Sequence, residues 1–206
     1  MGKDISKWRR KRQIQLRRRM AIFAVCMGAA AALIFMAVFL NRKSEEQSDT
    51  ESQEETEIVL TPECESYRSE VETVAKKHGM TEYVDLIMAV MMQERGGRSL
   101  DVMQCAEGVV NTKYPHVPNG ITDPSYSIDC GIQELKYALE KVECSDPTDI
   151  EKIKIALQGY NFGIDGFLAF LKEKGDVRWT EEYAQEYAKY ASGEIERDPS
   201  DAESMG

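Results

Sequence analysis

The sequence contains only two histidines in 206 residues and no CxxC pair. Two histidines argue against a histidine-based metal site or proton relay, and zinc sites of the cysteine type use closely spaced cysteine pairs. No nucleotide-binding motif, internal repeat or alternating strand pattern stands out. The sequence therefore predicts neither a metal nor a cofactor.

The two parts of the chain carry opposite excesses of charge, and the first part has almost no acidic residues. Residues 1–43 hold 11 Lys and Arg but one acidic residue, whereas residues 44–206 hold 35 Asp and Glu against 15 Lys and Arg. A uniform soluble globule does not divide its charge in this way. The acidic excess argues against nucleic acid as a partner of the globular part, because phosphate binding needs a positive surface.

Residues 20–40 contain no charged side chain, and a helix of these 21 residues spans about 31 Å, one hydrocarbon core. A cleaved signal peptide, a lipoprotein at Cys26 and a myristoylated Gly2 are alternatives. However, the apolar run ends without a small-residue cleavage site, and the residues before Cys26 match a lipobox poorly. The sequence predicts a retained transmembrane anchor.

Basic residues cluster before this segment, in residues 1–19, and only Arg42 and Lys43 follow it. The positive-inside rule places residues 1–19 in the cytoplasm and the rest of the chain outside; a nucleic-acid-binding arm is the alternative for the basic run. Residues 41–60 are predicted to be an acidic linker and residues 193–206 an acidic, disordered tail.

The remaining residues, 61–192, carry start and stop signals for about six helices, which predicts an all-α domain. The expected helices are 61–79, 81–96, 123–143, 146–162, 164–174 and 180–193, with an irregular loop over 98–122. The second helix is apolar nearly all round and is expected to be buried.

Glu94 lies at the end of that second helix. Burial would raise its pKa, and the helix C-terminus acts in the same direction. A carboxyl that stays protonated near neutral pH suits a general acid. The alternative is a solvated helix-end residue, with Gly96 as a plain C-cap.

Four motifs follow one another in this domain. They are Gln93-Glu94-Arg95-Gly96-Gly97, Met103-Gln104, Ser127-Ile128 with Gly131-Ile132, and Gln158-Gly159-Tyr160-Asn161-Phe162-Gly163. In order and spacing they resemble the motifs of the goose-type lysozyme and lytic transglycosylase superfamily. Over residues 63–192 the pattern is similar to the lysozyme-like (muramidase) domain of CwlT-type cell-wall hydrolases. It departs at Arg95, where the family usually has Ser, and at Cys105-Ala106, where it often has Ser-Ser.

The resemblance implies a lysozyme-like fold and an enzyme that cleaves the MurNAc–GlcNAc bond of peptidoglycan. With the anchor that the apolar run predicts, this enzyme would be held in the membrane outside the cell, facing the wall. The resemblance also implies that Glu94 is the general acid and that Gln104 lines the cleft. Tyr160 and Asn161 would orient the acid and the sugar. As partners it implies peptidoglycan, the cytoplasmic membrane and a conjugation or cell-wall synthesis apparatus.

The second catalytic carboxylate is left open between two loop residues. Glu107 matches a Glu of the family pattern, whereas Asp101 is expected to be an ordinary solvated loop residue. A hydrolase needs a second carboxylate, but a lytic transglycosylase closes an anhydro ring without water and needs only one. Hydrolysis is favoured; a lytic transglycosylase and a non-enzymatic wall-binding protein on the same fold are the alternatives.

Four cysteines lie outside the predicted anchor. An even number in an exported domain suggests two disulfides; free thiols or a metal site are the alternatives. The four are Cys64, Cys105, Cys130 and Cys144. Cys130 and Cys144, at opposite ends of one helix, would lie about 21 Å apart, beyond the roughly 7 Å that a disulfide allows. Because the Met-Gln loop of this fold lies near the start of the following helix, the favoured pairs are Cys105–Cys130 and Cys64–Cys144.

Overall fold

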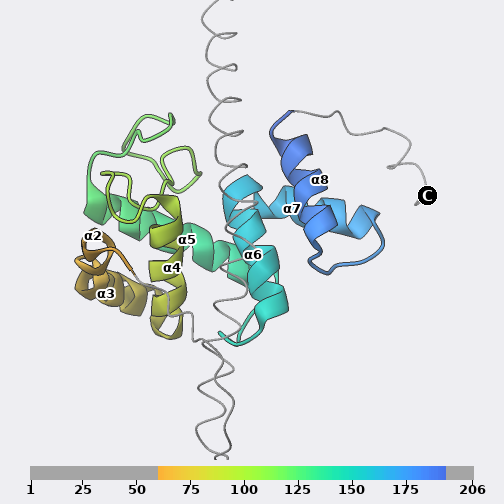
Figure 1. Cartoon of the computed structure of the whole chain (residues 1–206), viewed down its shortest axis with the longest axis horizontal. Helices are drawn as coiled ribbons and strands as arrows, with labels where there is room; N and C mark the ends of the chain where they lie inside the picture. The colour runs from red at the N-terminus through yellow and green to blue at the C-terminus, as the bar shows by residue number, and fades with distance from the viewer. Residues whose placement is uncertain (1–59, 194–206) are drawn as a thin grey trace, which may run out of the picture. The chain divides into compact units, whose positions relative to one another are not determined.

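The structure, a computed structural model, describes residues 60–193. These residues form α-helices and one short 3-10 helix, and no strand occurs among them. The helices are α2 (Pro62–Glu65), α3 (Arg68–His78), η1 (Thr81–Tyr83), α4 (Val84–Glu94), α5 (Pro124–Lys141), α6 (Ile150–Phe162), α7 (Ile164–Glu173) and α8 (Glu181–Ala191) (Figure 1). The all-helical prediction is confirmed for this part of the chain.

The predicted anchor over residues 20–40 lies outside the described residues, as do nearly all of the linker and the tail. Among residues 60–193, no helix is both long enough and apolar enough to cross a membrane.

Two helix boundaries differ from the prediction because short polar side chains bond to nearby backbone. The first expected helix is split into α2 and α3, and at the break the Ser66 hydroxyl donates to the Glu63 carbonyl at 2.6 Å. α6 starts at Ile150 rather than near Pro147. There the Asp146 carboxylate accepts from both the backbone N–H and the hydroxyl of Thr148, at 2.7 and 2.6 Å. Such local bonds compete with helix formation, and the count rises from about six helices to seven α-helices within residues 60–193.

The described residues cluster in two compact units. The first comprises residues 60–136 and 146–150, and the second comprises residues 137–145 and 151–193. In the first unit α2 and α3 pack on α4, as Figure 1 shows. Its fully buried large side chains are Ile87, Met88, Met91, Met103, Ile121, Ile128, Ile132 and Leu135.

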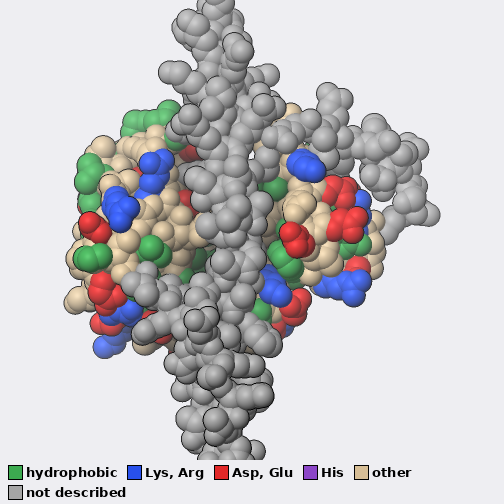
Figure 2. Space-filling model, viewed as in Figure 1, with side chains coloured by type: hydrophobic (Ala, Val, Ile, Leu, Met, Phe, Trp, Pro, Cys, Tyr) green, Lys and Arg blue, Asp and Glu red, His purple; other side chains and the backbone are tan. Residues whose placement is uncertain are grey.

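Aromatic packing between α7 and α8 forms the core of the second unit. The ring of Tyr187 lies 5.1 Å from that of Phe167 and 5.4 Å from that of Phe170. The buried Gln158 side chain of α6 donates to the Ala184 carbonyl of α8 at 2.9 Å. On the face shown in Figure 2, acidic and basic side chains are interspersed on the surface of each unit.

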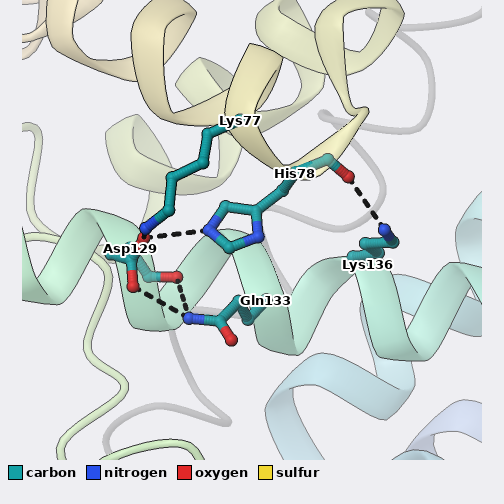
Figure 3. A network of polar contacts seen from close by, with 5 residues as sticks. All are labelled: Lys77, His78, Asp129, Gln133 and Lys136. Carbon is teal, nitrogen blue, oxygen red and sulfur yellow. Dashed lines mark hydrogen bonds and ion pairs between the residues drawn. The ribbon is translucent and has the colours of Figure 1, made fainter.

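A polar network joins the C-terminal end of α3 to α5 in the first unit (Figure 3). One oxygen of Asp129 accepts from Lys77 at 2.8 Å and contacts the His78 ring at 2.9 Å. Gln133 donates to the other oxygen, and Lys136 donates to the His78 carbonyl, at 2.9 and 2.8 Å. Burial acts to raise the pKa of Asp129, but the bonds from His78 and Lys77 outweigh it and the pKa is lowered. The network links the C-terminal end of α3 to α5.

Candidate functional site

α4 carries Glu94 as its last residue. The helix interior is buried through Ile87 and Met91, and Glu94 itself is half-buried. The helix ends here because Arg95 leaves the helical conformation. The structure therefore places the predicted general acid where an apolar helix meets a turn.

The two glycines after Glu94 serve different purposes. Both have a left-handed backbone, with φ of 60° at Gly96 and 76° at Gly97, which glycine adopts without strain. A Cβ on Gly97 would lie only 2.8 Å from the backbone nitrogen of Cys64. Gly97 is thus also required for the close approach of this turn to α2, and the Thr61 hydroxyl strengthens the contact by donating to the Gly96 carbonyl at 2.6 Å.

Asp101 differs from the sequence expectation. It is 1 % exposed rather than solvated. Its carboxylate accepts from the Ser127 hydroxyl at 2.8 Å and from the backbone N–H groups of Cys105 and Ala106 at 3.1 and 3.2 Å. Ser127 also accepts from the N–H of Met103 at 3.0 Å. These bonds join the Met-Gln motif to the Ser-Ile motif at the start of α5, so Asp101 organises the loop.

Gln104 is 8 % exposed and has a left-handed backbone, with φ of 52°. Its amide nitrogen donates to the Asp101 carbonyl at 2.7 Å, to the Asn119 side chain at 2.9 Å and to the Ser99 hydroxyl at 3.2 Å. The amide nitrogen is therefore engaged within the loop. A cleft-lining role of Gln104 stays a prediction.

Asn111 organises the next part of the same loop and is 1 % exposed. Its amide nitrogen donates to the carbonyls of Ala106 and Tyr114 at 2.7 and 3.0 Å. Its oxygen accepts from the Tyr114 N–H at 3.0 Å. Buried side chains thus supply the hydrogen bonds that helices supply elsewhere.

Glu134 on α5 is a residue that the sequence reasoning did not single out. Its Oε1 atom is buried and has no hydrogen-bond partner. Burial raises the pKa of Glu134 to about 7; the Val110 N–H acts against this rise, and the nearby Asp101 adds to it. The periodicity of the predicted helix gave no signal for this residue. Glu107, the candidate second carboxylate, lies in the loop over residues 98–122 and is half-buried.

Tyr160 and Asn161 lie at the end of α6, in the second unit, and both are half-buried. The Asn161 amide nitrogen donates to the Leu157 carbonyl at 3.0 Å. Glu94, Gln104 and Glu107 belong to the first unit. A joint action of Tyr160 and Asn161 with Glu94 stays a prediction.

All four cysteines of the described residues are free thiols in the structure, so neither predicted bridge is formed there. Cys105 and Cys130 lie near enough for each thiol to affect the pKa of the other. Cys64 is fully buried, its thiol lies 3.7 Å from the Met88 carbonyl, and Cys144 belongs to the other unit. The two bridges stay predictions. Within residues 60–193, no group of three or more metal-binding side chains occurs.

Residues 61–202 match the family model described as Lysozyme-like. The chain belongs to the lysozyme-like family. It is 36% identical over 132 residues to the bifunctional muramidase/DL-endopeptidase CwlT of Bacillus subtilis, a match that covers 64% of this chain and 36% of the relative. The resemblance to the CwlT-type lysozyme-like domain is thereby confirmed.

Two further relatives extend the comparison. The uncharacterized membrane protein YocA of Bacillus subtilis is 28% identical over 77% of this chain and 64% of its own length. A solved structure from Staphylococcus aureus, titled as similar to a lipoprotein of the NLP/P60 family, is 30% identical with a TM-score of 0.55. That match covers 66% of this chain and 42% of the other. The chain thus spans between about a third and two thirds of the length of these relatives.

Proposed function

We propose that this protein is a peptidoglycan hydrolase of the lysozyme type, an N-acetylmuramidase that cleaves the MurNAc–GlcNAc bond. Membership of the lysozyme-like family and the likeness to CwlT support the class of reaction. The observation that carries the residue assignment is the place of Glu94, half-buried at the end of an apolar helix and separated from the Gly96-Gly97 turn only by Arg95.

In this proposal Glu94 donates its proton to the leaving glycosidic oxygen. A muramidase that follows the two-carboxylate scheme uses a second carboxylate either to form a covalent intermediate or to activate water. Glu107 is the proposed second group, because Asp101 is 1 % exposed and its carboxylate is held by loop hydrogen bonds. Gln104, Tyr160 and Asn161 are proposed to contact or orient the sugar.

The test is Glu94→Gln in the full chain, assayed on purified cell wall. The amide keeps the shape of the side chain but cannot deliver a proton, so turnover should fall by about 10²- to 10⁴-fold. Glu72→Gln, at an exposed position of α3, is the matched control and should leave turnover unchanged. Wild-type turnover of Glu94→Gln would contradict the assignment and favour a non-enzymatic wall-binding protein.

Glu107→Gln then separates hydrolysis from transglycosylation. A hydrolase that needs the second carboxylate loses most of its activity and forms reducing MurNAc ends. A lytic transglycosylase loses little and forms 1,6-anhydroMurNAc ends. Mass spectrometry of the released fragments distinguishes the two products.

We also propose that residues 20–40 anchor the protein in the cytoplasmic membrane, with residues 44–206 outside. The charge-free run and its basic flank support this topology. Protease added to intact, wall-stripped cells should remove the external part and leave a membrane-bound N-terminal fragment. A soluble mature form that begins after residue 40 would contradict it.

A further inference from the structure

The carboxyl of Glu134 lies against the backbone of the loop that follows the Met-Gln motif. A Cβ built on Gly108 would overlap the Oε1 and Cδ atoms of Glu134, so a larger residue at this loop position requires the carboxyl end of Glu134 to move. The backbone N–H of Val110, two residues later, lies near the same carboxyl and acts to lower its pKa. One side chain of α5 thus contacts the loop at two points on either side of Val109.

A buried carboxyl oxygen without a hydrogen-bond partner costs free energy and calls for an explanation. Glu134 Oε1 is in that state. Glu107 directly precedes Gly108, and Gln104 lies on the same loop. The carboxyl therefore lies against the backbone of the segment that carries both of these residues.

We propose that Glu134 is a positioning residue: its carboxyl, placed between α5 and the backbone of Gly108 and Val110, fixes the loop that presents Gln104 and Glu107 to the glycan. This inference rests on the proposed function of those two residues. In this proposal Glu134 itself does not contact the substrate.

The groups around Glu134 make this role dependent on its protonation. Asp101 faces it from the loop and opposes its ionisation, as burial does. The buried thiols of Cys105, on the loop, and Cys130, on α5, also interact with it. None of these groups is a cation, and Glu107 adds a further acidic residue to the loop. The neutral carboxyl holds the loop, and its ionisation puts a buried negative charge beside Asp101 and loosens the contact.

A double-mutant cycle on the full chain tests the contact. Gly108→Ala alone displaces the Glu134 carboxyl from the loop backbone. If that carboxyl fixes the loop, the loop shifts, and a displacement of about 1 Å can reduce kcat/KM on cell wall by about 10²-fold. Glu134→Ala removes the obstructing atoms, so adding Gly108→Ala to it should cost less than twofold. Strictly multiplicative effects of the two substitutions would overturn the proposal.

Hydrogen exchange gives a readout that does not depend on activity. In the wild type, the protection factor of peptides covering residues 104–110 should fall as the pH rises through 7, relative to peptides of α4. Glu134→Gln keeps an amide oxygen for the Val110 N–H but cannot ionise, so its protection should stay constant from pH 6 to 8. Equal pH dependence in both proteins refutes the positioning role. A protein inactive on cell wall that still shows this difference would disprove the proposed function and leave the contact intact.

Discussion

Replacing Asp101 with Asn will loosen the loop over residues 98–122 while leaving α4 folded. The carboxylate of Asp101 has acceptor oxygens on both sides, whereas an Asn side chain has one acceptor and one donor. If the Asn oxygen keeps the bonds to the Ser127 hydroxyl and the Cys105 N–H, the new amide nitrogen faces the N–H of Ala106, which is 3.2 Å from the carboxylate in the structure. Two donors then meet at a buried site.

The magnitude follows from that one contact. Leaving a buried donor unsatisfied costs about 1–3 kcal/mol, and hydrogen bonds to a charged acceptor lie at the upper end of the usual range. A loss of about 2–3 kcal/mol of local stability corresponds to roughly 30- to 150-fold faster opening of the loop. The charge of the carboxylate is also lost, which weakens the two bonds that remain.

Hydrogen exchange with mass spectrometry measures this effect locally. Peptides covering residues 103–106 should lose protection by the stated factor, whereas peptides of α3 should not change. Asn111→Asp is the comparison in the next part of the loop. The Asn111 amide nitrogen donates hydrogen bonds to two backbone carbonyls, and a carboxylate has no hydrogen to donate to them. If Asp101→Asn exchanges like the wild type over these peptides, the carboxylate does not organise the loop and the reasoning is wrong.

Three further predictions concern stability, measured by chemical denaturation. Gly97→Ala should destabilise the first unit by at least about 2 kcal/mol more than Gly79→Ala. Both glycines have a left-handed backbone, but only a Cβ on Gly97 would clash with other backbone atoms, those of Cys64. Equal effects of the two substitutions would contradict the close approach. The pKa of Asp129 is lowered by its His and Lys partners although burial opposes this, so its carboxylate should stabilise the fold by about 1 kcal/mol above pH 4. This stabilisation by the Asp129 carboxylate is lost as the pH falls through its lowered pKa. The Asp129→Asn variant should lack it at every pH. Burial raises the pKa of Glu134 from an ordinary 4.5 to about 7, so the wild type should lose roughly 3 kcal/mol as the pH rises through this window, and Glu134→Gln should show a flat profile.

The helices could be predicted from the sequence because their signals are local. Gly79 ends α3 with a left-handed residue, Thr180 caps α8 with its side chain, and Pro124 begins α5 as expected. The late start of α6 was missed because the Asp146 turn uses the same residue type that also caps helices.

The candidate site could be predicted only in part, because the missing information lies in contacts between distant residues. Glu94 was found because its motif is contiguous in the chain. Asp101 was expected to be solvated because its partner Ser127 lies 26 residues further on. Glu134 looked like an ordinary polar position of a helix, and its burial depends on how closely Gly108 approaches.

The loop over residues 98–122 has no regular secondary structure of its own. Its framework consists of inward-facing side chains, chiefly Asp101 and Asn111, whereas Leu100, Val109 and Val117 are 55%, 88% and 39% exposed. Internal framework and outer surface are therefore encoded by different residues. For protein engineering, this makes the loop a scaffold: libraries at the three exposed positions can vary its surface without touching the side-chain hydrogen bonds that keep it folded.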